Sequence, residues 1–150
     1  MVRRGLLGAF FPFLIAGAAG CGSSSPTAPI ADPTVVSDTF TGTINPLGTD
    51  SHTFTVAYAG GTSNASVTVV ALATVANQTP QTITIGVGFG SLNQGVCTPA
   101  LTIPAAAVGA ELATTSSPFL AGGYCVLVFD NPAAPTVTEP LTYTIKVNHF

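Results

Sequence analysis

Beyond about residue 37, apolar and polar residues alternate along the chain with a period of two. Threonine fills most of the polar positions in these runs. Successive side chains of a β-strand point to opposite faces of a sheet, so the pattern predicts half-buried strands. The clearest runs of this kind are 39–44, 53–58, 82–89, 124–130 and 141–148.

Two stretches are less regular. Residues 65–75 are apolar on both phases in their middle, which predicts a central strand covered on both faces. In the stretch 97–118, a proline and a glycine leave room for barely one turn of helix. We therefore expect only short strands there, near 100–103 and 111–114.

Turn segments such as 45–50 and 60–64 separate the runs. Several short strands divided by turns at this spacing indicate an all-β sandwich or barrel. The predicted strands occupy 37–150, a length that supports one domain with a single core. Among the side chains on the inward phase, we expect the following to be buried: Phe54, Val56, Val126, Val128 and Tyr143.

Residues 1–20 have the anatomy of an export signal. Arg3 and Arg4 form a short positive region, an apolar run follows as far as Ala16, and small residues complete the segment. The apolar run is shorter than a membrane-spanning helix requires.

The segment 18–21, Ala-Ala-Gly-Cys, resembles the lipobox of bacterial lipoproteins. The resemblance implies cleavage before Cys21, diacylation of its thiol and acylation of the new amine, which together anchor a protein in a membrane. Residues 21–36, rich in Ser, Pro and Thr, would then form a flexible tether. Gly22 stands where the family's inner-membrane retention signal has Asp, which favours the outer membrane of the bacterial envelope. The alternative is a soluble exported protein in which Cys21 is incidental.

The charge balance argues against one class of partner. After residue 20 the chain keeps a single cation, Lys146, against six carboxylates. A nucleic-acid binder needs a basic face that displaces counterions, so we expect no nucleic-acid partner.

Two cysteines remain besides Cys21. In an exported chain, Cys97 and Cys125 predict a disulfide, whose loop of roughly 29 residues would stabilise the fold by about 3–4 kcal/mol. One alternative is a pair of free buried thiols. Another is zinc binding, but with no histidine near in the sequence the two thiols would supply only half of the four ligands of a zinc site.

Both ends of the folded region resemble the bacterial pre-peptidase C-terminal domain. The segments that carry the resemblance are Asp-Thr-Phe-Thr-Gly-Thr-Ile at 38–44, His-Thr-Phe-Thr-Val at 52–56, Leu-Ala-Gly-Gly-Tyr-Cys-Val-Leu-Val-Phe-Asp at 120–130 and Leu-Thr-Tyr-Thr-Ile-Lys-Val at 141–147. Gly123 stands where the family has Thr before Tyr. The resemblance implies a small jelly-roll-like sandwich, used as an accessory module beside secreted enzymes. Together with the strand pattern, it predicts a single jelly-roll-like antiparallel β-sandwich of about 7–9 strands.

The sequence offers no catalytic constellation. It has no Gly-x-Ser-x-Gly motif, and its carboxylates lie scattered at predicted turns and strand ends. His52 stands at the start of a strand on the polar phase, and His149 adjoins the C-terminus, so we expect both to be ordinary exposed or edge residues. We therefore expect a protein without catalytic activity and without a cofactor.

Calcium binds to oxygen atoms that loops supply, so acidic and amide side chains in a predicted loop are candidate calcium ligands. Asp130, Asn131 and Glu139 bracket one loop, but no Asp-x-Asp-x-Asp spacing occurs. These three residues are therefore only weak calcium candidates. The alternative, which we favour, is that Asp130 and Asn131 close a strand through turn chemistry.

Rows of threonine on the outward phase are the most unusual surface feature. They comprise Thr39, Thr41, Thr43, Thr53, Thr55, Thr82, Thr84, Thr142 and Thr144. Threonine suits the solvent face of a strand, which explains the rows without any ligand. The rows also suit contact with a glycan or a partner protein. Two functions follow: a binding module of the envelope, or a structural or assembly lipoprotein without a small ligand.

Overall fold

The computed structural model describes residues 34–57, 64–114 and 120–150. These residues form eight strands: β1 (Val36–Ile44), β2 (Thr49–Val56), β3 (Ser66–Thr74), β4 (Ile85–Asn93), β5 (Val96–Ala106), β6 (Glu111–Ala113), β7 (Gly122–Phe129) and β8 (Leu141–His149). The all-β prediction is confirmed. Within the described ranges, no helix is long and apolar enough to span a membrane.

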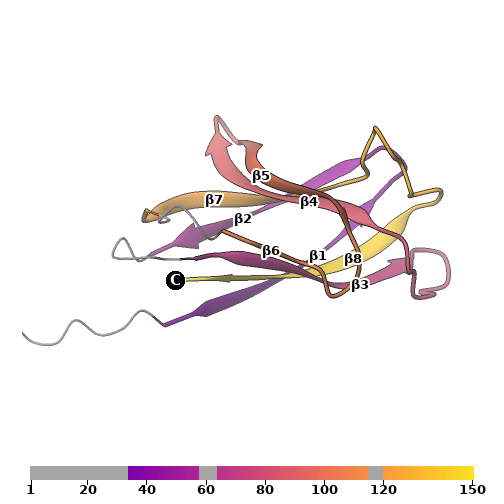
Figure 1. Ribbon diagram of the computed structural model, residues 1–150, viewed down its shortest axis with the longest axis horizontal. Coiled ribbons are helices and arrows are strands. Elements are labelled where there is room, and N and C mark those ends of the chain that lie inside the picture. Colours follow the sequence, from indigo (N-terminus) through magenta and orange to yellow (C-terminus); the bar gives the residue numbers. More distant parts are fainter. Residues whose placement is uncertain (1–33, 58–63, 115–119) are drawn as a thin grey trace, which may run out of the picture. The chain divides into compact units, whose positions relative to one another are not determined.

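The strands pair into two antiparallel sheets of four. Sheet A has the order β1-β8-β3-β6 and sheet B the order β2-β7-β4-β5, and Figure 1 shows the two layers packed face to face. The first strand pairs with the last, β2 with β7, β3 with β6 and β4 with β5. The chain is therefore one long hairpin wound so that successive strand pairs alternate between the sheets. This is the jelly-roll arrangement that the sequence predicts.

The core lies between the two sheets. In β8, Tyr143, Ile145 and Val147 face inward, whereas Lys146 faces outward. The five side chains predicted to be buried are all buried, with at most 5% of their surface exposed. The period-two pattern thus identifies the core face of the confident strands correctly.

The prediction that β3 is covered on both faces is wrong. Val70 is 47% exposed, and a β-bulge between Val69 and Ala71 breaks the register with β8. An extra residue shifts the alternation, so adjacent apolar residues here do not imply two covered faces. The chain that follows β5 binds at the bulge: the Val69 N–H donates to the Ala110 carbonyl at 3.1 Å, and the Gly109 N–H donates to the Val69 carbonyl at 2.8 Å.

The strands β4 and β5 are shifted or longer than predicted. β4 begins at Ile85 and continues to Asn93, and the short strand expected at 100–103 is part of the eleven-residue β5. Gln94 and Gly95 join the two strands with positive φ angles of 52° and 83°. Two such residues form the tight turn that suits the twist of a hairpin, so pairing continues up to the turn.

Glycines allow the outer face of β4 to be covered by its neighbours. Gly86, Gly88 and Gly90 alternate with the core residues of β4 and are buried. A Cβ atom at Gly86 would collide with the ring of Phe129, and one at Gly90 would collide with the backbone of Thr98. The missing side chains therefore let β7 and β5 close over β4 from its two sides.

A disulfide joins β5 to β7 across β4. The Sγ atoms of Cys97 and Cys125 lie 2.05 Å apart and their Cα atoms 5.7 Å apart. Cys97 belongs to β5 and Cys125 to β7, the two neighbours of β4, and Cys125 stands opposite Gly90 in the register. The predicted pairing is confirmed. Cys21 lies outside the described residues.

The strand register defines two ends of the sandwich. At the proximal end, where the chain runs into β1, Val36 pairs with His149, and Figure 1 shows the start of β1 close to the C-terminus. The end of β2, the start of β7 and the β4–β5 turn lie at this end too. The distal end carries the turn 45–48 and the loops 75–84 and 130–140.

Candidate functional site

Four threonines form a two-by-two grid on the outer face of sheet A. In the register of β1 and β8, Thr41 stands beside Thr144, and Thr43 stands beside Thr142. The residues between them on each strand take the inward phase. The grid therefore presents hydroxyl and methyl groups alone, without a charge. We call these four residues the threonine grid.

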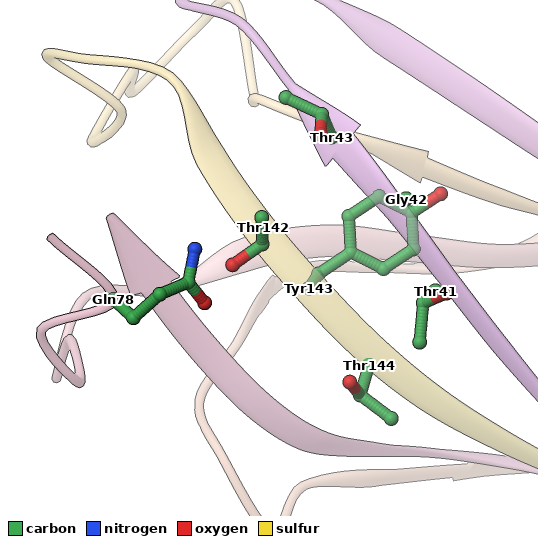
Figure 2. A pocket seen from close by; sticks show the side chains of 7 residues that line it. All are labelled: Thr41, Gly42, Thr43, Gln78, Thr142, Tyr143 and Thr144. Carbon is green, nitrogen blue, oxygen red and sulfur yellow. The ribbon is translucent and has the colours of Figure 1, made fainter. Parts of the chain in front are cut away.

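The threonine grid lines a depression of about 360 Å³ in the sheet face, together with Gly42, Tyr143 and Gln78. Gln78 comes from the turn that follows β3 and has a left-handed backbone with a φ angle of 55°. Its N–H donates to the Thr74 carbonyl at 3.0 Å, which holds the turn in place. Figure 2 shows the Gln78 amide pointing toward Thr142. The turn thus adds an amide to the hydroxyls of the grid.

The depression is rich in groups that can bind a ligand by hydrogen bonds. The Thr142 hydroxyl donates to the Ala73 carbonyl at 3.2 Å. The hydroxyls of Thr41, Thr43 and Thr144 have no partner within the described part of the chain. Each of these three can donate one hydrogen bond and accept two. The site therefore suits a neutral ligand that itself carries hydroxyl or amide groups.

Beneath the depression, Tyr143 links the two sheets. Its buried ring crosses over Gly42, where a Cβ atom would collide with the Tyr143 hydroxyl, and Figure 2 shows the ring reaching from β8 to β1. The hydroxyl donates to Asp50 Oδ2 at 2.6 Å and lies 2.7 Å from His52 Nε2. Because the single hydroxyl proton goes to the carboxylate, His52 Nε2 is the donor of the second bond. We call this chain of His52, Tyr143 and Asp50 the polar clasp.

The polar clasp closes the side of the sandwich that is formed by the edge strands β1 and β2. Burial raises the pKa of the Tyr143 hydroxyl, and the hydrogen bond to Asp50 and the charge of Asp50 raise it further. The hydroxyl is therefore a permanent donor at physiological pH. His52 lies on the edge strand β2, but the prediction that it stands on the polar phase at the start of the strand is wrong. It is the fourth residue of β2, shares the inward phase of Phe54 and Val56, and is half-buried. Its ring stacks on Phe40 with 4.9 Å between the ring centroids. The members of the clasp bind one another, which suits a structural link between β8 and β2.

The prediction that His149 is an ordinary exposed residue is wrong. Its surface is only 4% exposed, its Nε2 lies 3.0 Å from Asp38 Oδ2, and its ring centroid is 5.1 Å from that of Phe54. A carboxylate only accepts, so Nε2 carries the proton, and Nδ1 has no partner among the described residues. β8 lies between β1 and β3. The inward alternation of β8 continues through Val147 to His149, which is the signal that places this residue in the core.

Asp130, a calcium candidate, binds backbone groups instead. It is buried, and its Oδ2 accepts the Leu47 N–H at 3.0 Å. Its Oδ1 accepts the N–H groups of Thr136 at 3.0 Å and Val137 at 3.4 Å. Burial works to raise the pKa of Asp130, but these three hydrogen bonds outweigh it and hold the pKa below its ordinary value. Asp130 thus ties the turn after β1 to the loop after β7.

The other two calcium candidates do not join Asp130 in a site. Asn131 Oδ1 accepts the Ala133 N–H at 3.0 Å, and Glu139 is exposed. In the ranges that the structure describes, no three His, Cys, Asp or Glu side chains gather as metal ligands would. For Asp130 and Asn131 the structure supports turn capping, the alternative that the sequence favours.

Two comparisons with known proteins return no match. No family model matches the chain, and no curated protein is significantly similar to it. The resemblances to bacterial lipoproteins and to the pre-peptidase C-terminal domain therefore stay predictions.

Proposed function

We propose that this protein is a non-catalytic, lipid-anchored binding module of the bacterial envelope, and that its ligand is a neutral glycan held on the threonine grid. The observation that carries the proposal is the uncharged depression in the outer face of sheet A, lined by four threonines and Gln78. A saccharide presents many hydroxyl groups, which pair with hydroxyl and amide groups of this kind. The lipobox at residues 18–21 supports the anchor, with the outer membrane as its place.

The chemistry of the depression also defines the strength of binding. Its lining carries no charge, so long-range electrostatic steering contributes little to association. We expect weak binding of a single copy, which many copies tethered on one membrane would strengthen. Binding should change little with ionic strength, because few charges are available to be screened.

Isosteric substitutions test the proposal. Thr41→Val with Thr144→Val removes two hydroxyls from the grid while keeping the shape of the side chains. The matched control is Thr53→Val with Thr55→Val, which removes two exposed hydroxyls from β2 in the other sheet. Isothermal titration against a panel of neutral oligosaccharides, including tetra-N-acetylglucosamine, should show binding that the grid variant weakens by about ten-fold or more. The control variant should bind as the parent does.

Two results would overturn the glycan proposal. One is the lack of any binding across the panel, and the other is equal binding by the grid variant and the parent. Turnover of an ester, peptide or glycoside that a single substitution abolishes would overturn the non-catalytic assignment.

A second candidate is a structural or assembly lipoprotein that contacts another envelope protein. The observation that favours it is the edge of sheet A at β1, a nine-residue strand without proline whose only partner among the described strands is β8. Such an edge can accept a strand from a partner. By contrast, the edge strand β5 contains Pro99 and Pro104, and β6 has only three residues. Cross-linking from β1 to one envelope protein, without glycan binding, would favour this candidate.

A further inference from the structure

We infer that the proximal end of the sandwich rests on the lipid bilayer, with exposed apolar side chains in contact with the headgroup region. The inference rests on the lipid anchor of the proposed function and goes beyond it, because an anchor on a flexible tether does not by itself orient a domain. It gives the molecule a membrane-facing end and leaves the threonine grid on a side face.

Large exposed apolar side chains gather at the proximal end. Ten such side chains occur among the described residues, and five of them are proximal: Val35, Val36, Leu92, Val96 and Leu120. They belong to the start of β1, the β4–β5 hairpin and the segment before β7, so both sheets contribute. Leu92 Cδ1 lies 3.9 Å from the position of a Cβ at Gly123, which places the hairpin next to the start of β7. A concentration of exposed apolar surface of this kind marks a contact with a partner or a membrane.

The distal end carries more negative charge than the proximal end. Three of the five carboxylates in the described ranges lie at the distal end: Asp50, Asp130 and Glu139. The other two, Asp38 and Glu111, lie in the proximal half of sheet A, and Asp38 is hydrogen-bonded to His149. Lys146 stands beside Thr39 in the proximal half of sheet A. The proximal half therefore carries two carboxylates and one cation, against three carboxylates at the distal end, so anionic lipid phosphates would repel the distal end more strongly.

The length of the tether agrees with this orientation. About 15 residues separate Cys21 from Val36, so the anchor would lie only a short stretch of sequence away from the start of β1. The tether joins the sandwich at β1, so the acyl chains would hold the proximal end at the surface. Contact of a few apolar side chains then needs no further ordering of the anchor.

A single tryptophan can report the orientation, because the chain contains none. Val96→Trp places the probe at the proximal end, and Val75→Trp places it at the distal end as the matched control. The two valines are 66% and 43% exposed, so neither substitution disturbs the core. Each variant is purified as the processed protein, its acyl chains are counted by mass spectrometry, and it is reconstituted into phosphatidylethanolamine–phosphatidylglycerol vesicles with brominated acyl chains.

The expected result is acylated protein in which bromine quenches the Val96→Trp emission by about two-fold or more and leaves the Val75→Trp emission unchanged. Hydrogen exchange of the unsubstituted protein should likewise slow on vesicles in 92–97 and not in 75–81. Acylated protein with equal quenching at both positions, and no slowing in 92–97, would overturn the orientation while leaving the anchor intact. Protein without acyl chains would overturn the anchor and the orientation with it.

Discussion

The substitution Gly42→Ala should destabilise the sandwich strongly, although it adds only one methyl group. The new Cβ atom would occupy the space of the Tyr143 hydroxyl and of Asp50 Oδ2. These two groups form the central hydrogen bond of the polar clasp, at 2.6 Å. Alanine at this position therefore forces the clasp to open or the edge of sheet A to move away from sheet B.

The magnitude follows from the contacts that are lost. A hydrogen bond to a charged group contributes about 1.5–3 kcal/mol, and forcing a methyl group into a filled site costs about 1–3 kcal/mol. Asp50 is partly exposed, so water replaces part of the lost bond. We expect the free energy of unfolding to fall by about 2–4 kcal/mol in total, which corresponds to a decrease of about 8–16 °C in Tm for a domain of this size.

Thermal unfolding followed by circular dichroism measures this effect, with Gly123→Ala as the control. A Cβ atom at Gly123 has its nearest neighbour at 3.9 Å, an ordinary contact. That variant should be neutral or slightly stabilising, because alanine restricts the unfolded chain more than glycine does. If Gly42→Ala melts within about 2 °C of Gly123→Ala, the polar clasp does not hold the sheets together and the reasoning is wrong.

Three further predictions concern other contacts. Asp130→Asn should lower the free energy of unfolding by about 2 kcal/mol at neutral pH. Folding lowers the pKa of Asp130, so its contribution to the free energy of unfolding is complete above the ordinary pKa of 3.8 and is lost as the pH falls below that value. Urea titrations at several pH values should therefore show that the difference in stability between variant and parent shrinks in acid; a constant difference would contradict the prediction. Replacing both Cys97 and Cys125 by alanine should cost about 3 kcal/mol, and alkylation of protein taken directly from cells should find neither thiol free; two alkylated thiols would contradict the disulfide. Cys21→Ser should leave an uncleaved precursor without acyl chains by mass spectrometry, and a variant still processed and membrane-bound like the parent would refute the lipid anchor.

The alternation of apolar and polar residues within one strand predicts which of its side chains face the core. In β8, the inward residues Tyr143, Ile145 and Val147 follow directly from the period of two, and so does the outward Lys146. The same rule, extended by two positions, places His149 in the core. Its nearness to the end of the chain suggested exposure, but packing of its ring against Phe54 of sheet B buries it.

Other features depend on which strands meet, and a single strand cannot reveal them. The bulge at Val70 becomes visible only in the register with β8, because the extra residue is defined by the partner strand. From its own strand, Gly42 is expected only to lower the stability of β1. In the structure, its missing side chain makes room for the Tyr143 ring of the neighbouring strand β8. The depression likewise needs Gln78 from a separate turn beside the threonine grid.

The winding of the chain has a consequence for the order in which the protein can fold. Among the described strands, only β4 and β5 are neighbours both in sequence and in a sheet, so every other pairing closes a longer loop. Formation can begin at the β4–β5 hairpin and proceed outward to the pair of β1 with β8. In sheet A, β8 lies between β1 and β3, so β1 cannot join the sheet until β8 is present. If the chain is exported from its N-terminus, as the predicted export signal implies, sheet A can be completed only after β8 has crossed the membrane.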